Sequence, residues 1–246
     1  MTDPAIHLGL PAGTRACLFD LDGVLTRTAV LHAGAWTQMF DDFLAEAAPD
    51  QPTFSPSDYQ DYVDGKPRLE GTRDFLAARH LDLATGAEDD PPDARTLWGL
   101  SNRKNDLIQE LIRERGIDVY PGSVSYLREV RSAGLRAVVV TSSANAVQVL
   151  DAAKLSDMFD ARIDGVIAKD RDLKGKPAPD TFLAGADEVG VAPEDAAVFE
   201  DALAGVEAGR AGGFARVIGV DRVGQADRLR AHGADVVVSD LSELLR

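Results

Sequence analysis

The chain is predicted to fold as an α/β protein, in which a doubly wound parallel sheet is interrupted by one inserted helical domain. Three observations predict this class. From Val119 onward, apolar β-branched runs alternate with helical patterns. Residues 30 to 115 instead carry mostly helical spacing. The apolar runs also end in acids or hydroxyls, as strands do where open α/β sheets hold ligands. We therefore expect a core domain formed by residues 1–28 and 117–246, and a helical cap domain formed by residues 29–116.

The first apolar run is residues 16–24, ACLFDLDGV, and it predicts a buried strand. This strand delivers two carboxylates, Asp20 and Asp22, at its carboxyl end. Gly23 can adopt backbone angles that residues with a Cβ avoid, so the chain can turn sharply after the second acid. Taken alone, the two acids could also be a solvated strand end. Cys17, the one cysteine of the chain, lies inside the run, which indicates core packing rather than a nucleophile.

The inserted domain is predicted from apolar residues at helical spacing, with a loop between its first and last helices. The spacing rests on two sets: Leu31, Ala35, Met39 and Phe43 at the start, and Leu97, Leu100, Leu107 and Leu111 near the end. The proline-rich acidic stretch GAEDDPPDA predicts a solvated loop rather than a site. After this domain, further strands are expected near residues 135–141, 162–167, 196–200, 215–220 and 234–238.

The segment VVVTSSAN ends a predicted strand in the hydroxyls of Thr141, Ser142 and Ser143. Hydroxyls and free backbone amides between a strand and a helix can bind an oxyanion. Serine and threonine before a helix are also common as plain N-caps, so this segment alone is a weak indication.

The segment LKGKPAPD places Lys174 and Lys176 before two prolines, which we expect to hold the chain extended until a helix begins near Asp180. A lysine fixed in this way can bring a point charge to a phosphate. Viewed alone, a solvated basic loop explains the segment equally well.

The segment AAVFEDALAGVEAG ends another predicted strand in adjacent acids, Glu200 and Asp201. Adjacent carboxylates repel each other unless a cation or solvent screens them, and Mg²⁺ takes carboxylates together with phosphate oxygens and water. The alternative is acidic capping of the following helix. The combination decides between these interpretations, because parallel strands side by side would bring the acids, hydroxyls and lysine to one edge of the sheet.

Four motifs, DLDGV, TSSAN, KPAPD and FEDALAGVEA, resemble those of the haloacid dehalogenase-like superfamily of phosphoryl-transfer enzymes. The chain is most similar to the β-phosphoglucomutase-like group, from Arg15 onward. The resemblance implies a Rossmann-like core with a helical cap. It also implies a role for each motif residue: Asp20 as nucleophile, Asp22 as general acid/base, Thr141 and Lys176 as ligands of the transferring phosphoryl group, and Mg²⁺ bound by the carboxylates of Asp20, Glu200 and Asp201 and the backbone carbonyl of Asp22.

Elementary chemistry agrees with these roles. A carboxylate that attacks phosphorus forms an acyl phosphate, which divides one difficult transfer into two easier ones. Two anions must approach each other for this attack, so the site needs cations, here Mg²⁺ and Lys176. A second acid, Asp22, can give a proton to the leaving oxygen and take one from the incoming hydroxyl.

The same resemblance implies substrate-binding residues in the cap. His32 and Trp36 in HAGAW match a histidine and a tryptophan at the cap entry. The segment DGKPR, with Gly65, places Arg68 where the group has an arginine for the distal phosphate, and Lys104 in NRKND matches a second cation. Without the resemblance, Trp36 reads as core, His32 as a satisfied surface histidine and Lys104 as a solvated helix charge.

One position departs from the pattern of the group. A lysine that helps to bind the distal phosphate is replaced here by Ala144. Ser142, Ser143 and Asn145 remain as expected substrate contacts, and Arg68 or Lys66 could supply the missing charge. The departure bears on the substrate more than on the reaction.

Composition limits the partners. The formal net charge of -15 argues against nucleic acid and anionic membranes. No apolar stretch is long enough to cross a bilayer, and the N-terminus lacks a signal-peptide pattern, so we expect a cytoplasmic protein. We also expect a monomer.

The leading hypothesis is a Mg²⁺-dependent phosphomutase that interconverts β-D-glucose 1-phosphate and D-glucose 6-phosphate. It would work through a phospho-Asp20 enzyme and a bisphosphorylated sugar. The chief alternative is a phosphatase of the same fold that acts on a sugar phosphate or another small phosphomonoester. A non-catalytic binding module is the third reading, and the complete set of motif residues argues against it.

Overall fold

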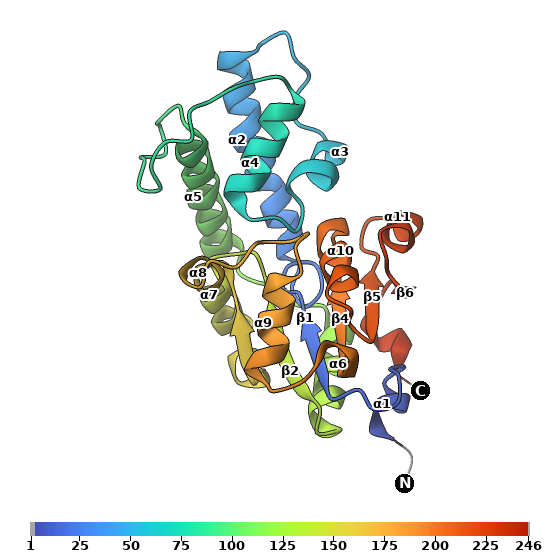
Figure 1. Cartoon of the computed structure of the whole chain (residues 1–246). Coiled ribbons are helices and arrows are strands. Elements are labelled where there is room, and N and C mark those ends of the chain that lie inside the picture. Colours follow the sequence, from blue (N-terminus) through green and yellow to red (C-terminus); the bar gives the residue numbers. More distant parts are fainter. Residues whose placement is uncertain (1–2, 246) are drawn as a thin grey trace. The chain divides into compact units, whose positions relative to one another are not determined.

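The computed structural model describes residues 3–245 and divides the chain into two compact units (Figure 1). The core unit comprises the residues up to Arg27 together with those from Ile117 onward, and the helical unit comprises Thr28–Gly116. Each unit has its own hydrophobic core and is described separately. No helix among the described residues is both long and apolar enough to cross a membrane.

The core unit contains a parallel sheet, which confirms the predicted fold class. Among residues 3–245 the sheet has six strands in the order β3-β2-β1-β4-β5-β6. The strands are β1 (Ala16–Phe19), β2 (Arg136–Val140), β3 (Ala161–Ile163), β4 (Ala196–Glu200), β5 (Arg216–Val220) and β6 (Val236–Val238). Strands β2 and β3 are added on one side of β1, and strands β4, β5 and β6 are added on its other side. The carboxyl ends of β1 and β4 therefore flank the point where open α/β sheets bind ligands.

Helices cover both faces of this sheet. The described helices of the core unit are α1 (Pro4–His7), α6 (Pro121–Ser132), α7 (Ala146–Ala152), α8 (Gly165–Asp170), α9 (Asp180–Glu188), α10 (Leu203–Ala211) and α11 (Ala226–Ala231), with short 3₁₀ turns η2 (Ser156–Met158), η3 (Pro193–Asp195) and η4 (Leu241–Leu244). On one face Leu18 and Val138 pack against Phe182 of α9. On the other, Phe19 stacks on Phe199 at 4.5 Å and meets Tyr126 of α6 edge-on. Strands buried on both faces explain the continuous apolar runs.

Cys17 lies fully buried within β1, and burial raises the pKa of its thiol. A thiol in this state is a weak nucleophile. The expected role in core packing is confirmed.

Two local predictions were wrong. The strand expected over 162–167 ends at Ile163, because the Asp164 carboxylate caps α8 by accepting hydrogen bonds from Val166 N and Ile167 N at 3.0 and 2.9 Å. The segment before α9 is not extended either. Ala178 N donates to Gly175 O at 3.0 Å, which closes a turn, since the fixed φ of proline suits turns as well as extended chain.

The helical unit is built from α2 (Thr28–Ala47), α3 (Pro56–Asp58), the π-helical turn η1 (Tyr59–Val63), α4 (Arg68–Ala78) and α5 (Leu97–Arg115). Its core is aromatic: Phe40 lies 4.1 Å from Phe75 and 5.1 Å from Phe54, measured between ring centroids. Ala35, Met39 and Phe43 of the predicted helical spacing are buried. The GAEDDPPDA segment forms no helix or strand, as expected.

Candidate active site

Two acids follow β1 on a turn that only glycine permits. Asp20 is buried, and its backbone N–H donates to Phe199 O at 2.9 Å, which continues the pairing with β4. Gly23 has φ +94°, and a Cβ there would lie 1.8 Å from the Asp201 Oδ2 atom. The turn after Asp22 therefore presses the backbone against the Asp201 carboxylate, which no side chain at position 23 would allow.

Lys176 is the charged centre of the site. Its Nζ donates to Asp20 Oδ1 at 2.6 Å, to Glu200 Oε1 at 2.5 Å and to Val140 O at 3.1 Å. All three donors of the ammonium are thus used, as a buried lysine requires. Burial lowers the pKa of this ammonium, but the Asp20 and Glu200 carboxylates raise it more, so Lys176 remains charged.

The carboxyl of Asp20 is under opposing influences. Burial raises its pKa most, and although Lys176 lowers it, the net pKa stays well above the usual range, with Glu200 and Asp22 raising it further. One ammonium does not offset this concentration of acids. A further cation beside Asp20 would favour the ionised form that a nucleophile needs.

A cluster of three buried acids provides oxygen ligands for such a cation. Carboxylate oxygens of Asp20, Glu200 and Asp201 lie within 4.8 Å of one another. Ala202 N donates to Glu200 Oε2 at 2.9 Å, and a Cβ at Gly205 would lie 1.8 Å from Glu200 Oε1, so the glycine makes room for this carboxylate. An all-oxygen donor set is the kind that Mg²⁺ prefers, so these residues fit that ion.

The hydroxyls after β2 join the second acid. Thr141 Oγ1 donates to Asp22 Oδ2 at 3.2 Å and accepts a hydrogen bond from Ser143 N at 3.1 Å. Ser143 Oγ in turn accepts from Asn145 N at 3.1 Å. The loop that contains Ser142 and Ala144 is thereby shaped around Thr141, which itself is buried.

The helical unit brings a second group of predicted residues together. Lys104 Nζ lies 2.8 Å from His32 Nδ1 and 4.9 Å from the centroid of the Trp36 ring. Lys104 is only 5% exposed, so it is not a solvated helix charge. Trp36 also belongs to the hydrophobic core of the unit, where it stacks on Phe40.

Arg68 has different neighbours. Its Nη2 lies 3.4 Å from Asn102 Oδ1, its guanidinium lies over the Trp98 ring at 5.7 Å, and burial lowers its pKa. Gly65, with φ +72°, lies in the turn before α4. Lys66, the other candidate for the missing charge, is paired with Asp74 at 2.7 Å.

Two residues beside the site were missed by the sequence analysis. Gln225 Nε2 donates to the Asp201 carbonyl at 3.0 Å, and Arg222 Nε donates to the Gly23 carbonyl at 2.8 Å. Both act on backbone atoms about 24 and 199 residues away in the chain, so no local motif could indicate them.

A Rossmann-like sheet whose strand ends hold buried acids, a hydroxyl and a lysine is typical of phosphoryl-transfer proteins. The profile of the haloacid dehalogenase-like hydrolase family matches residues 14–213. A β-phosphoglucomutase of Mycobacterium tuberculosis is 53% identical, over 97% of this chain and 94% of its own length. The chain therefore belongs to the haloacid dehalogenase-like hydrolase family, in the group of enzymes that contains the β-phosphoglucomutases.

Two further comparisons span the wider family. The crystal structure of a β-phosphoglucomutase from Clostridium difficile is 27% identical, with a TM-score of 0.75 over 94% of this chain and 93% of that one. Hexitol phosphatase A of Escherichia coli is 28% identical, over 92% of this chain and 91% of its own length.

Proposed function

We propose that the protein is a Mg²⁺-dependent phosphomutase that interconverts β-D-glucose 1-phosphate and D-glucose 6-phosphate. The observation that carries this proposal is the pairing of two differently placed acids. Asp20 contacts Lys176 and belongs to the acid cluster, whereas Asp22 is hydrogen-bonded to Thr141. A mutase needs both, one carboxylate to accept the phosphoryl group and another to move protons.

In the first half-reaction, a carboxylate oxygen of Asp20 attacks phosphorus and the bond from phosphorus to the sugar oxygen breaks. Asp22 gives its proton to the leaving sugar oxygen, and the product is an aspartyl phosphate. Lys176 and Thr141 hold the oxygens of the transferring group. The short contact from Lys176 Nζ to Asp20 Oδ1 supports this role, because the ammonium would reach the phosphoryl oxygens from the same position.

The second half-reaction turns the transfer into an isomerisation. The 6-hydroxyl of β-glucose 1-phosphate loses its proton to Asp22 and takes the phosphoryl group from phospho-Asp20, which forms glucose 1,6-bisphosphate. The bisphosphate then turns around, and its 1-phosphate returns to Asp20. Glucose 6-phosphate leaves, and the phosphoenzyme is regenerated.

The carboxylates of Asp20, Glu200 and Asp201 and the backbone carbonyl of Asp22 would hold Mg²⁺. When bound, this ion offsets the negative charge that nucleophile and phosphate bring together. The buried acids, which a single ammonium neutralises incompletely, support this assignment.

The substrate contacts that we propose lie in both units. Ser142, Ser143 and Asn145 follow β2, while His32, Trp36, Gly65, Arg68 and Lys104 belong to the helical unit. The helical unit would act as a cap that keeps water from the phosphoenzyme. Lys104 supports this role, because its buried ammonium lies beside His32 and the Trp36 ring, two other residues that we propose as substrate contacts. We further propose that the protein is a cytoplasmic monomer.

A phosphatase that acts on a sugar phosphate or another small phosphomonoester is the second candidate. Ala144 favours it, because the loop after β2 offers no cation there for the phosphate that is not reacting. The 28% identity to a hexitol phosphatase favours it as well. Water would then replace the sugar hydroxyl in the second half-reaction.

One assay separates these functions. The protein receives β-glucose 1-phosphate, Mg²⁺ and a trace of glucose 1,6-bisphosphate, and glucose 6-phosphate and inorganic phosphate are measured together. Glucose 6-phosphate in large excess supports the mutase. Inorganic phosphate as the main product supports the phosphatase, and neither product overturns both.

A further inference from the structure

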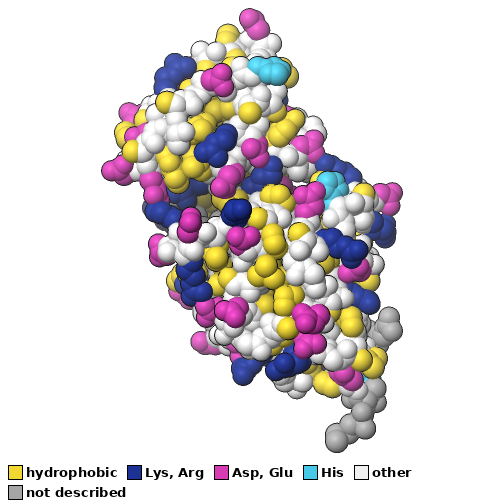
Figure 2. Space-filling model, viewed as in Figure 1, with side chains coloured by type: hydrophobic (Ala, Val, Ile, Leu, Met, Phe, Trp, Pro, Cys, Tyr) yellow, Lys and Arg dark blue, Asp and Glu magenta, His cyan; other side chains and the backbone are white. Residues whose placement is uncertain are grey.

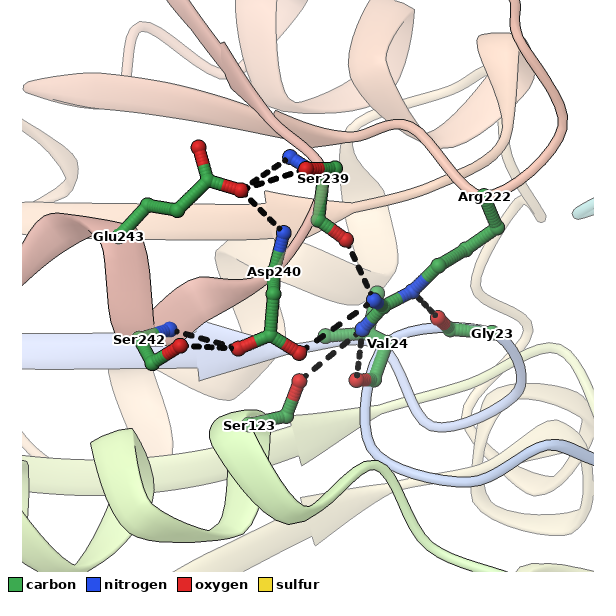
Figure 3. A network of polar contacts seen from close by, with 8 residues as sticks. All are labelled: Gly23, Val24, Ser123, Arg222, Ser239, Asp240, Ser242 and Glu243. Carbon is green, nitrogen blue, oxygen red and sulfur yellow. Dashed lines mark hydrogen bonds and ion pairs between the residues drawn. The ribbon is translucent and has the colours of Figure 1, made fainter.

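Arg222, which follows β5, directs its guanidinium at a group of backbone carbonyls and polar side chains (Figure 3). Its side chain is 11% exposed. Nε donates to Gly23 O at 2.8 Å, and Nη2 donates to Val24 O at 3.2 Å and to Ser123 Oγ at 3.1 Å. Nη1 donates to Ser239 O at 2.6 Å. Three segments far apart in the sequence therefore meet on one guanidinium group.

Among the described residues, this guanidinium forms its ion pair with Asp240. Asp240 Oδ2 lies 3.6 Å from Nη1, and the face of the guanidinium stacks on the Tyr120 ring at 3.5 Å. The loop that presents these partners is itself braced, since Glu243 Oε1 accepts hydrogen bonds from Ser239 N and Asp240 N. These acceptors lie on different sides of the side chain, so they match the several N–H donors of a planar guanidinium and not the single nitrogen of a lysine. Arg222 is therefore held by a specific set of hydrogen bonds and is not part of a simple surface ion pair.

The carbonyl that Arg222 holds belongs to the turn of the active site. Gly23 N donates to Thr26 O at 2.8 Å, so both sides of this residue are fixed, one by Thr26 and the other by Arg222. Gly23 directly follows Asp22, and its Cα packs against the Asp201 carboxylate. The Gly23 N–H belongs to the peptide bond that follows Asp22, so we expect a change in the backbone angles of Gly23 to shift the Asp22 backbone as well.

Arg222 also touches the chain where it passes between the two units. Tyr120 N donates to Leu25 O at 2.9 Å, and Arg27 N donates to Asp118 O at 2.8 Å, so the outgoing and returning segments are paired within the core unit. The Tyr120 ring contacts both Arg27, at 4.6 Å, and Arg222. One side chain thus links the crossing segments to the turn after Asp22.

We propose that Arg222 is a positioning residue for the proton transfer by Asp22. It holds the Gly23–Val24 backbone in the orientation that places the Asp22 carboxyl beside Thr141, and it does not touch the substrate. The proposal rests on the proposed function in one respect, the role of Asp22 as general acid and base.

The test compares leaving groups that differ in their need for a proton. Arg222→Met removes every donor but keeps the stem, and Arg222→Lys keeps the charge without the fork. Arg210→Met is the matched control, because the Arg210 side chain is 68% exposed and pairs with Asp235 in the same half of the core unit. Phosphoenzyme formation is measured with glucose 1,6-bisphosphate, whose alkoxide must be protonated, and with p-nitrophenyl phosphate, whose leaving group needs no proton.

We expect Arg222→Met to slow transfer from the bisphosphate by about 10²-fold, as displacements of about 1 Å in a catalytic group do, with p-nitrophenyl phosphate changed less than about 3-fold. Arg222→Lys should behave like Arg222→Met, and Arg210→Met like the unmodified protein. In an Asp22→Asn background, Arg222→Met should cost almost nothing more, because both act on one step. Equal losses on both substrates, no loss, or full additivity with Asp22→Asn would overturn the proposal.

A second measurement does not depend on catalysis. Amide hydrogen exchange of residues 21–26 should accelerate in Arg222→Met and Arg222→Lys, while exchange in β2 stays unchanged. Unchanged exchange in residues 21–26 would overturn the positioning role even if the reaction proved different from the one proposed. Faster exchange, in a protein that lacks the mutase and phosphatase activities, would uphold the role of Arg222 in the turn and reject the proposed function alone.

Discussion

Each unit contains a buried lysine: Lys176 lies among the acids of the core unit, and Lys104 lies in the Lys104 cluster of the helical unit (His32, Trp36 and Lys104). The two lysines differ in the contacts that they make. Lys176 is held by two carboxylates and a carbonyl, so all its donors are used within the protein. Lys104 lies against an imidazole nitrogen and an aromatic face. The first lysine completes a preorganised site. The second belongs to the group of residues that we propose as substrate contacts.

The difference follows from the elements that position the residues. The register of the parallel strands β1, β2 and β4 brings Asp20, Thr141 and Glu200 to the same edge of the sheet, at the carboxyl ends of the strands. The proposed substrate contacts of the helical unit lie on helices, apart from Gly65 in the turn before α4, and these helices pack around the aromatic core of their own unit. We therefore expect substitutions in the core site to abolish the reaction, and substitutions in the helical unit to change which substrates the protein prefers.

The largest effect is expected from Asp20→Asn. An amide is a poor nucleophile, so formation of both glucose 6-phosphate and inorganic phosphate should fall by about 10⁴-fold or more. Both products are measured in the assay described above. Asp195→Asn, at a partly exposed acid at the opposite ends of the strands, is the control and should keep full activity. Substantial turnover by Asp20→Asn would exclude the covalent role.

Gly205→Ala tests how tightly the core site is built. The new Cβ would lie 1.8 Å from Glu200 Oε1, so the carboxylate must move. We expect kcat to fall about 10²-fold and the free energy of unfolding to drop by about 1–3 kcal/mol. Gly34→Ala on α2 is the control, because its Cβ would meet only Leu111 at 3.9 Å and should be neutral or stabilising. If the two variants behaved alike, the contrast between the units would be lost.

Arg68→Ala tests the helical unit. If Arg68 contacts the distal phosphate, kcat/KM for β-glucose 1-phosphate should fall by about 10-fold to 100-fold, while that for a small phosphoester such as p-nitrophenyl phosphate changes little. Lys66→Ala, which removes the cation paired with Asp74, separates the two candidates for the missing charge. An equal loss on both substrates would show that Arg68 does not discriminate between them.

The smallest effect concerns pH and the stability of the helical unit. Burial raises the pKa of Asp58, but hydrogen bonds from Ser55 and the nearby Arg79 lower it more, so the net pKa lies below the ordinary 3.8. This stabilisation is present above pH 3.8 and is lost as the pH falls through the lowered pKa. Asp58→Asn should therefore cost about 1 kcal/mol of unfolding free energy at pH 7 and less at pH 2. Equilibrium denaturation at both pH values measures the difference, and an unchanged cost at pH 2 would assign the effect to packing.

Strand ends were the most predictable part of the molecule. The runs before Asp20, Thr141 and Glu200 end where expected, because apolar β-branched stretches bounded by polar residues have few alternatives in a buried sheet. The strand predicted near 162–167 ends early because Asp164 caps the N-terminus of a helix. Its apolar neighbours Val166 and Ile167 belong to that helix.

The support around the site was not predictable in the same way. Arg222 holds the turn after Asp22 through the carbonyl oxygens of Gly23 and Val24. Every residue possesses such an oxygen, so this role leaves no signature in the sequence of the turn. The Lys104 cluster was predicted only through the family resemblance. Without the resemblance, Trp36 was expected in the core, and it does belong there, while its ring also contacts Lys104.

The isolation of Cys17 inside β1 makes the chain convenient for spectroscopy. Because this sulfhydryl is buried, we expect that reagents that attach dyes or spin labels to cysteine will not react with it in the folded protein. Replacing Val30, 69% exposed on α2, and Val147, 47% exposed on α7, by cysteine would give two labelling sites, one in each unit. A labelled pair of this kind would report how the separation between the units changes during turnover.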